Sequence, residues 1–455
     1  MAKSKKTGEI YTPKWVTEKM LSMVGFNGNY LKKHVMDNSC GVGSMLLCVI
    51  KRPLADYWDG KISKAECIEY LEKYVHGIEI NPDAYGRCIK NLDEFASKYH
   101  LSSIKWDVRN CDALSCNDYN YQMDYVIGNP PYIRVHDLDA EKIKSYSFTK
   151  GGMTDIYLAF YELGLRMLAP NGHLIYISPS SWYTSVAGEE MRKHALLFKD
   201  LVDVYDFEHE QLFDGVTTYV SISHFMADGK EHPIKFQSPS FSGEGWADEF
   251  TIDKKFYFTD PASFDTLKKS IEWGKSHKEK RYVVKNGYAT LADSVFITGE
   301  TMKNDEGPAW EKETPHTYLK KIVKASTGKF SNMIYPYEEN GKLADEEQLK
   351  TLSPIEYQWL EAHKEQLLSR STDYPWYAFG RTQAINDTYS CKFAVSSLIS
   401  KNVGIKCTIA NPGVGVYGGL YILPVYQNNV FVYIVDEMFI RRALYSKDFF
   451  DYVKS

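Results

Sequence analysis

Residues 35–46 read VMDNSCGVGSML, and this stretch decides the fold. A short apolar strand ends at the acidic Asp37, and Gly41 and Gly43 open the helix that follows. Glycines at such a turn let the backbone come close to a ligand, beside the free N–H groups of a helix N-terminus. Because Gly-x-Gly turns also serve as plain tight connections, the stretch predicts a strand–loop–helix unit and leaves ligand binding open.

Segments with strand-like and helix-like patterns alternate through the first half of the chain. The expected strands are 35–37, 75–80, 104–108, 125–128, 173–178, 201–207 and 219–225. The expected helices are 13–24, 43–50, 82–99, 155–168 and 187–198. We expect Thr12 to cap the first helix, with Pro13 at its first position. The alternation predicts a doubly wound, mostly parallel α/β sheet of Rossmann-like type with seven strands.

The pattern changes near residue 230. A polar segment rich in Gly and Ser leads into the second half of the chain, which has no regular alternation of strand and helix patterns. Aromatic residues are frequent there. We therefore expect two domains, 1–240 and 241–455, and the second to be of α+β type.

Acidic residues close two further strands of the expected sheet. Glu79 ends the second strand in GIEINP, and Asp112 follows the third in CDAL. Ligands of open α/β sheets bind outside the carboxyl ends of the strands, where an acid can accept the hydroxyls of a ribose. The positions of Asp37, Glu79 and Asp112 predict a nucleoside-type site at that edge.

The fourth strand ends in a rigid turn at residues 126–134, VIGNPPYIR. Pro130 and Pro131 each lack an N–H and fix φ, so they end the strand. The turn displays the Asn129 amide, the Pro130 carbonyl and the Tyr132 ring at the edge where the three acids converge.

Together these motifs resemble the S-adenosylmethionine-dependent adenine-N6 DNA methyltransferases of the gamma arrangement, as found in bacterial restriction–modification systems. The resemblance rests on NPPY, DNSCGVGSML, GIEINP and CDAL, and on three longer segments. These segments are IYTPKWVTEKM, TDIYLAFYELGLRMLAPNGHLIYISPSSW and EQLFDGVTTYVSISHF. One departure is DNSCGVG in place of the commoner D-P-A-C-G-S-G, although the acid and both glycines are kept.

The resemblance implies S-adenosylmethionine as cofactor and a methyltransferase sheet in the first domain. The residues that it implies as cofactor contacts are Tyr11, Thr12, Asp37, Cys40, Gly41, Gly43, Glu79, Ile80, Asp112, Ala113 and Asn129. The residues that it implies at the target amine are Asn129, Pro130, Pro131 and Tyr132. Phe213 would cover the second face of a flipped base, or would be a core aromatic beside Leu212.

The NPPY turn suits the methylation of a planar amine. Such a nitrogen is a poor nucleophile because its lone pair is delocalised into the ring. Acceptors on both of its N–H groups, Asn129 Oδ1 and the Pro130 carbonyl, would offset the positive charge that develops. Tyr132 would offer a stacking face, and an adenine inside a duplex would have to flip out to reach it.

The long second half suits a target-recognition domain for double-stranded DNA. Basic residues lie at 268–285 and at Lys320, Lys321, Lys324 and Lys329; they would contact phosphates or lie on solvated faces. Arg381, in YPWYAFGRTQAI, would reach a base edge or form an ion pair at the edge of the core. The formal net charge of −5 neither requires nor excludes nucleic acid, because a local basic face is what matters.

Hydropathy and cysteine spacing limit the class of protein. No apolar stretch approaches the roughly 18 residues of a membrane span, and the first residues lack the apolar core of a signal peptide, so we expect a cytoplasmic protein without membrane contact. The eight cysteines form no Cys-x-x-Cys pair and predict no metal site. We expect a monomeric methylase without a fused nuclease, whose partner in the cell could be a separate cognate restriction endonuclease.

Other acceptors share the NPPY chemistry. A methyltransferase of RNA or of a protein glutamine amide is one alternative, although such enzymes have little chain after the catalytic domain. A DNA-binding module that keeps the fold without turnover is the other alternative.

Overall fold

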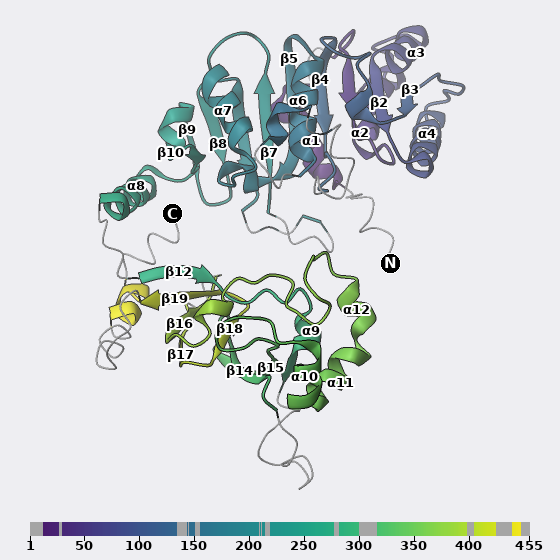
Figure 1. Ribbon diagram of the computed structural model, residues 1–455. Coiled ribbons are helices and arrows are strands. Elements are labelled where there is room, and N and C mark those ends of the chain that lie inside the picture. Colours follow the sequence, from purple (N-terminus) through teal and green to yellow (C-terminus); the bar gives the residue numbers. More distant parts are fainter. Residues whose placement is uncertain are drawn as a thin grey trace. The chain divides into compact units, whose positions relative to one another are not determined.

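The computed structural model describes residues 12–26, 30–133, 143, 145–150, 155–208, 210, 212–213, 219–276, 282–299, 316–397, 405–424 and 439–446. The chain divides into two compact units, Met1–Phe264 and Asp265–Ser455, which are described separately (Figure 1). The first unit thus extends beyond the boundary expected at residue 240. A separate function for each unit stays a prediction.

The first unit is built on one mixed sheet, in which the described residues form nine strands. In sheet order the strands are β3 (Asp107–Asn110), β2 (Val75–Glu79), β1 (Val35–Asp37), β4 (Met123–Gly128), β5 (Leu168–Pro179), β7 (Val220–Met226), β6 (Leu201–Asp206), β8 (Ile234–Gln237) and β9 (Ser242–Gly245). The first five strands are parallel, and β7 lies antiparallel between β5 and β6. Each expected strand overlaps one of these, but the expected number of seven is wrong, because β8 and β9 extend the sheet.

Alternate side chains of the central strands enter two separate cores, because successive residues of a strand point to opposite faces. Val126 of β4 and Tyr176 of β5 lie in one buried cluster. Ile127 and Ile175 lie in the other. Both faces of the sheet are therefore covered, as parallel sheets require.

Helices pack on both faces of this sheet (Figure 1). They are α1 (Lys14–Met23), α2 (Ser44–Trp58), α3 (Lys64–Lys73), α4 (Pro82–Ser97), α6 (Tyr157–Met167) and α7 (Glu189–Phe198). The prediction that Thr12 caps α1 is wrong: Pro13 occupies the N-cap position, and no side chain caps the helix. The hydroxyl of Thr12 instead accepts a hydrogen bond from the side chain of Asn129.

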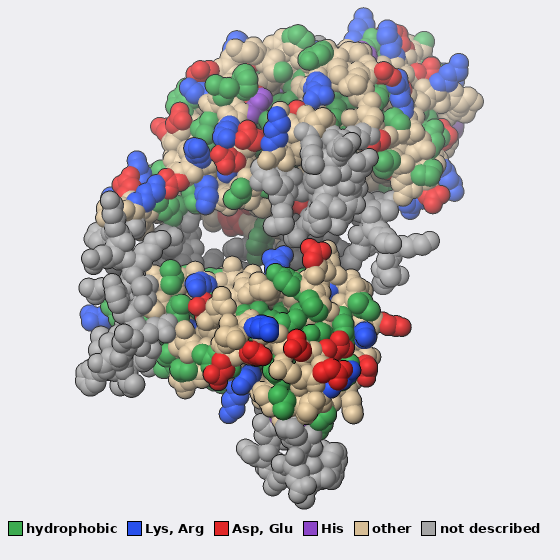
Figure 2. Space-filling view, viewed as in Figure 1, with side chains coloured by type: hydrophobic (Ala, Val, Ile, Leu, Met, Phe, Trp, Pro, Cys, Tyr) green, Lys and Arg blue, Asp and Glu red, His purple; other side chains and the backbone are tan. Residues whose placement is uncertain are grey.

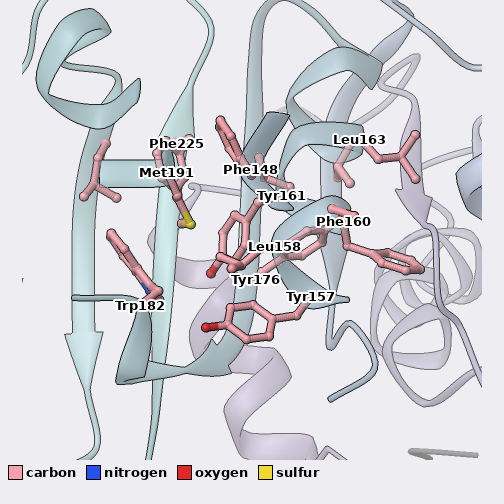
Figure 3. Close-up of a cluster of buried hydrophobic side chains, with 14 of the residues drawn as sticks. Phe148, Tyr157, Leu158, Phe160, Tyr161, Leu163, Tyr176, Trp182, Met191 and Phe225 are labelled. Carbon is pink, nitrogen blue, oxygen red and sulfur yellow. The ribbon is translucent and has the colours of Figure 1, made fainter. Parts of the chain in front are cut away.

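Aromatic side chains of α6 pack against the sheet in one of the two cores (Figure 3). Tyr161 on α6 contacts Tyr176 edge-on, with ring centroids 5.2 Å apart. Tyr176 then donates a hydrogen bond of 2.8 Å to Oδ1 of the buried Asn38, just after β1. This chain of contacts fixes the segment after β1, where the candidate site lies.

The second unit contains two four-stranded sheets among its described residues. One holds β12 (Tyr282–Asn286), β19 (Leu420–Pro424), β16 (Lys392–Val395) and β17 (Cys407–Ala410). The other holds β13 (Ile297–Gly299), β15 (Lys329–Ile334), β14 (Leu319–Lys324) and β18 (Gly415–Tyr417). Helices α10 (Glu346–Leu352) and α11 (Pro354–Ala362) contribute Leu349 and Leu360 to a buried aromatic cluster. In the described part of either unit, no helix has the length and apolar character that a bilayer span requires.

Candidate cofactor and catalytic site

The acid that ends β2 is bonded to the glycine loop that follows β1. Glu79 Oε2 accepts a hydrogen bond from the Gly41 N–H at 2.8 Å, and Glu79 Oε1 accepts one from the Asn81 N–H at 2.7 Å. Each carboxylate oxygen has a second lone pair, so the group can still accept hydroxyls of a ligand. The sequence-predicted residues Gly41 and Glu79 are thus brought together.

The two glycines of this loop have different tasks. Both adopt left-handed backbone conformations, with φ of +53° at Gly41 and +85° at Gly43. A Cβ at Gly43 would stand 2.8 Å from Cys88 Sγ, whereas a Cβ at Gly41 would meet no atom within 4 Å. Gly43 therefore allows α2 and α4 to pack closely, while Gly41 keeps the space over the loop open.

Asp37, the last residue of β1, is 2% exposed beneath this loop. Burial raises the pKa of its carboxyl to about 7; the nearby Glu79 charge raises this pKa further, whereas the hydrogen bond from the Ser39 N–H opposes the rise. Asp37 is therefore poised to change charge near neutral pH.

The end of β3 adds the predicted residues Asp112 and Ala113. Asp112 Oδ1 accepts a hydrogen bond from the Leu114 N–H at 2.9 Å and so starts a short 3₁₀ turn at Ala113. Asn110, which sequence reasoning missed, donates from Nδ2 to the Glu79 carbonyl at 2.8 Å. This bond joins the carboxyl ends of β2 and β3, and nothing local in the sequence signals it.

Asn129, at the end of β4, meets Thr12 from the segment before α1. Asn129 Nδ2 donates to Thr12 Oγ1 at 3.0 Å, and Ser39 Oγ donates to the Asn129 carbonyl at 3.4 Å. An added Cβ at the preceding Gly128 would lie 2.9 Å from the Tyr176 ring and 3.5 Å from Asp37 Oδ1. The ends of β1 and β4 thus approach each other closely, and the expected convergence of Asp37 and Asn129 is observed.

Pro130 is buried, and the Tyr132 ring is partly buried against both cores. The Tyr132 hydroxyl donates to the Ile177 carbonyl at 3.3 Å, and its ring meets that of Tyr157 edge-on at 6.4 Å. Burial raises the pKa of Tyr132 well above its ordinary value. Tyr132 is therefore held in a fixed orientation.

Two predicted residues stand apart from this group. Phe213 is 4% exposed and packs in the same core cluster as Phe207 and Val220, which agrees with the core alternative. A role for Phe213 against a base stays a prediction. Tyr11 lies outside the described residues.

The residues present fit S-adenosylmethionine. The open space over Gly41 gives a cradle that a Cβ would fill. Glu79 retains acceptor capacity beside it, and the neighbouring Ile80 is an apolar side chain that is 65% exposed. A nucleoside needs an acid for its ribose and an apolar surface for its base, and this edge supplies both.

Comparison with known proteins finds a likeness to one family over part of the first unit. The segment of residues 45–213 matches the Eco57I restriction-modification methylase family. It contains nearly all of helix α2, together with Glu79, Asp112 and the NPPY turn, and is called the methylase segment below.

Curated relatives extend the likeness beyond the methylase segment. The chain is 25% identical over 356 residues to the type II restriction enzyme and methyltransferase RM.Eco57I of Escherichia coli, over 67% of this chain and 35% of that protein. It is 30% identical over 180 residues to the type II methyltransferase M.AccI of Acinetobacter calcoaceticus, over 37% of this chain and 33% of the relative. The match therefore spans about a third of the length of each of these relatives.

Solved structures agree on the fold. The type IIL restriction-modification enzyme MmeI in complex with DNA matches 91% of this chain and 60% of its own, with a TM-score of 0.58 and 12% identity. A DrdV–DNA complex matches 97% of this chain and 52% of its own, with a TM-score of 0.56 and 12% identity.

The predicted lysines of the second unit lie on the β14–β15 hairpin, outside the methylase segment. Lys321, Lys324 and Lys329 are exposed, and no carboxylate of the described residues forms an ion pair with any of them. Lys324 and Lys329 are direct cross-strand partners, a placement of like charges that costs stability. Lys320 Nζ instead lies 5.8 Å from the centre of the Tyr389 ring.

Arg381 is also exposed in the second unit. Its backbone N–H donates to the Ala289 carbonyl at 3.1 Å, and within the described part of the chain its guanidinium forms no ion pair. The alternative of an ion pair at the edge of the core is therefore not observed. Figure 2 shows acidic and basic side chains interspersed on the visible face of each unit, so no single basic stripe marks that face.

Proposed function

We propose that the chain is a DNA methyltransferase of the restriction–modification type that transfers a methyl group from S-adenosylmethionine to N6 of adenine in double-stranded DNA. The observation that carries the proposal is the placement of Asn129 of the NPPY turn beside Asp37 and the glycine loop. A side-chain amide that would bind the acceptor would then lie at the same sheet edge as the proposed nucleoside cradle.

The cofactor supplies an activated methyl group on a sulfonium. Glu79 would accept the ribose hydroxyls with its remaining lone pairs, and Ile80, Asp112 and Ala113 would line the adenine. Gly41 would leave room for the amino acid end beside the loop. Because these groups are fixed to one another by the bonds at 2.7 to 2.9 Å described above, little reorganisation is needed on binding.

The chain's own part in the reaction is to bind and orient the target amine. Asn129 Oδ1 and the Pro130 carbonyl would each accept one N–H of the amine and so favour the positive charge that develops on nitrogen. Pro130 is buried and Pro131 follows it, so its carbonyl cannot swing away. Holding the nitrogen in line with the methyl group supplies much of the acceleration.

The target base would have to leave the duplex, since the turn lies in a protein edge that a stacked base cannot enter. The Tyr132 hydroxyl bonds the Ile177 carbonyl, so the ring would offer its stacking face in a fixed orientation. Phe213 would need to leave its core position, at least in part, to cover the second face of the base.

The second unit would bind the DNA. The exposed Lys321, Lys324 and Lys329 carry charges without carboxylate partners among the described residues, and phosphates between Lys324 and Lys329 would relieve their repulsion. Arg381 would be free to reach a base edge. The solved neighbours named above were studied in complex with DNA, and the curated relatives are named as type II methyltransferases, which supports DNA as the substrate. A cognate restriction endonuclease would be the companion of such an enzyme.

Tritiated S-adenosylmethionine offered separately with duplex DNA, tRNA and a release-factor protein tests this proposal. We expect label in DNA alone, and sequencing that detects modified bases should place it on adenine N6 within a short motif. Label in RNA or protein alone would overturn the choice of substrate. Cofactor and DNA binding without any transfer would indicate a module that keeps the fold without turnover.

A further inference from the structure

We propose that Thr12 is a positioning residue, whose hydroxyl restrains the side-chain torsions of Asn129 and so holds its amide in place for the acceptor amine. The inference rests on the proposed function for the identity of the acceptor. It adds to that function the group that restrains the catalytic amide.

The observation is a hydrogen bond between two segments that are 117 residues apart in the chain. Asn129 Nδ2 donates to Thr12 Oγ1 at 3.0 Å. Thr12 is 5% exposed, so water competes little for this bond. Its hydroxyl does not cap α1, because the helix begins at Lys14 with Pro13 in the N-cap position and without a side-chain cap.

An asparagine amide has a donor end and an acceptor end of nearly the same shape. A site that must accept an N–H is blocked when the amide turns its own N–H₂ toward the target, because two donors then face each other. In this structure Nδ2 is the end that bonds Thr12 Oγ1, which leaves Oδ1 as the end that can accept from a target amine. Rotation of the side chain away from Thr12 would leave this buried bond unmade.

The backbone of Asn129 is already fixed by other contacts. Ser39 Oγ donates to the Asn129 carbonyl at 3.4 Å, and Gly128 lies against the Tyr176 ring, with which an added Cβ would collide. The Thr12 hydroxyl restricts the torsions of the Asn129 side chain from a different segment of the chain.

Thr12→Val and Thr12→Ser form a matched pair for the test, because valine keeps the shape and loses the hydroxyl, whereas serine keeps the hydroxyl. At saturating cofactor, measured by single turnover, we expect Thr12→Val to lower the rate of methyl transfer about tenfold, the factor of roughly one neutral hydrogen bond. Thr12→Ser should stay within about threefold of the wild type. Calorimetry with S-adenosylmethionine separates this effect from any change in cofactor affinity.

A double-mutant cycle with Asn129→Ala shows whether Thr12 acts through Asn129. We expect Thr12→Val to cause no further loss in the Asn129→Ala background. Equal tenfold losses in both backgrounds would overturn the inference, as would a Thr12→Val defect confined to cofactor affinity or a Thr12→Val rate equal to the wild type.

The cycle is run on whichever acceptor the wild-type chain labels among duplex DNA, tRNA and release-factor protein. Label in tRNA or protein would overturn the proposed DNA substrate, while the cycle would still decide the role of Thr12. A wild-type chain that labels none of the three would overturn both proposals.

Discussion

Glu79 Oε2 accepts a hydrogen bond from the Gly41 N–H at 2.8 Å, so the acid at the end of β2 is bonded directly to the glycine loop after β1. The same carboxylate also accepts from Asn81 at the start of α4. One side chain therefore fixes the relative positions of the two turns that would surround the cofactor. Hydrogen bonds of the chain itself thus link the two turns at this edge of the sheet.

Alanine at the two loop glycines should separate packing from cofactor binding. Gly43→Ala strains a φ of +85° and puts Cβ 2.8 Å from Cys88 Sγ, so we expect a loss of unfolding free energy of about 1–3 kcal/mol. Gly41→Ala meets no neighbouring atom and should cost only about 1 kcal/mol, but it fills the space of the cofactor. Denaturant unfolding and cofactor titration measure the two effects.

Gly25→Ala is the control for this comparison, because it has a φ of +65° with open space around Cβ and lies outside the candidate site. It should lose about as much stability as Gly41→Ala and keep its cofactor affinity. Unchanged cofactor affinity in Gly41→Ala would contradict the proposed cradle.

Asp37→Asn should change the pH dependence of stability of the cofactor-free protein. The folded-state pKa of Asp37 is raised from 3.8 to about 7, so the folded state binds more protons than the unfolded state between these values. The contribution of this group to stability therefore falls as pH rises from about 4 to 7, by at most about 1.4 kcal/mol per pH unit.

Asparagine cannot ionise and keeps an acceptor for Ser39. Asp37→Asn should thus gain stability relative to the wild type at pH 8 and show little gain at pH 4. Parallel stability curves across this range, measured by urea unfolding, would show that Asp37 does not titrate as its burial implies.

Reversing the charges of the hairpin should weaken DNA binding. With Lys321, Lys324 and Lys329 all changed to Glu, the slope of log K against log salt should become shallower by about 0.9 for each phosphate that the protein no longer neutralises. Lys350→Glu is the control, because Lys350 already pairs with Glu347 at 2.7 Å in the same unit. If the triple variant keeps the wild-type slope, these lysines do not contact phosphates and lie on a solvated face instead.

The sequence predicts the parts of the fold that local patterns encode. The limits of β1 and the acid at the end of β2 follow from short apolar runs that stop at Asp37 and Glu79. Helix α2 runs past Pro53 to Trp58, although the helix expected from the sequence ends at residue 50, before this proline. The buried Val49 and Leu54 beside it show that packing outweighs the lost hydrogen bond.

Other features were missed for different reasons. Helix α3 carries a capping box from Ser63 to Glu66, a signal that the sequence did contain. Strands β8 and β9 are four residues each at the edge of the sheet, too short for a clear alternation. The contact of Thr12 with Asn129 joins residues 117 positions apart, so only the fold brings it about.

Asn129→Asp is the finer test of the amide at the NPPY turn. It keeps an oxygen in the acceptor position, loses the N–H₂ that donates to Thr12, and adds a negative charge. We expect slow methyl transfer with cofactor and DNA affinities within roughly tenfold of the wild type, because an interaction specific to the transition state lowers turnover and not binding.

Single-turnover methyl transfer by Asn129→Ala tests the central claim most directly. The variant loses one of the two acceptors for the target amine, and removal of such a group typically costs on the order of 100- to 1000-fold in rate. Cofactor and duplex affinity, measured on the same preparation, should remain within roughly tenfold of the wild type. Methyl transfer at the wild-type rate would contradict the role assigned to the NPPY turn.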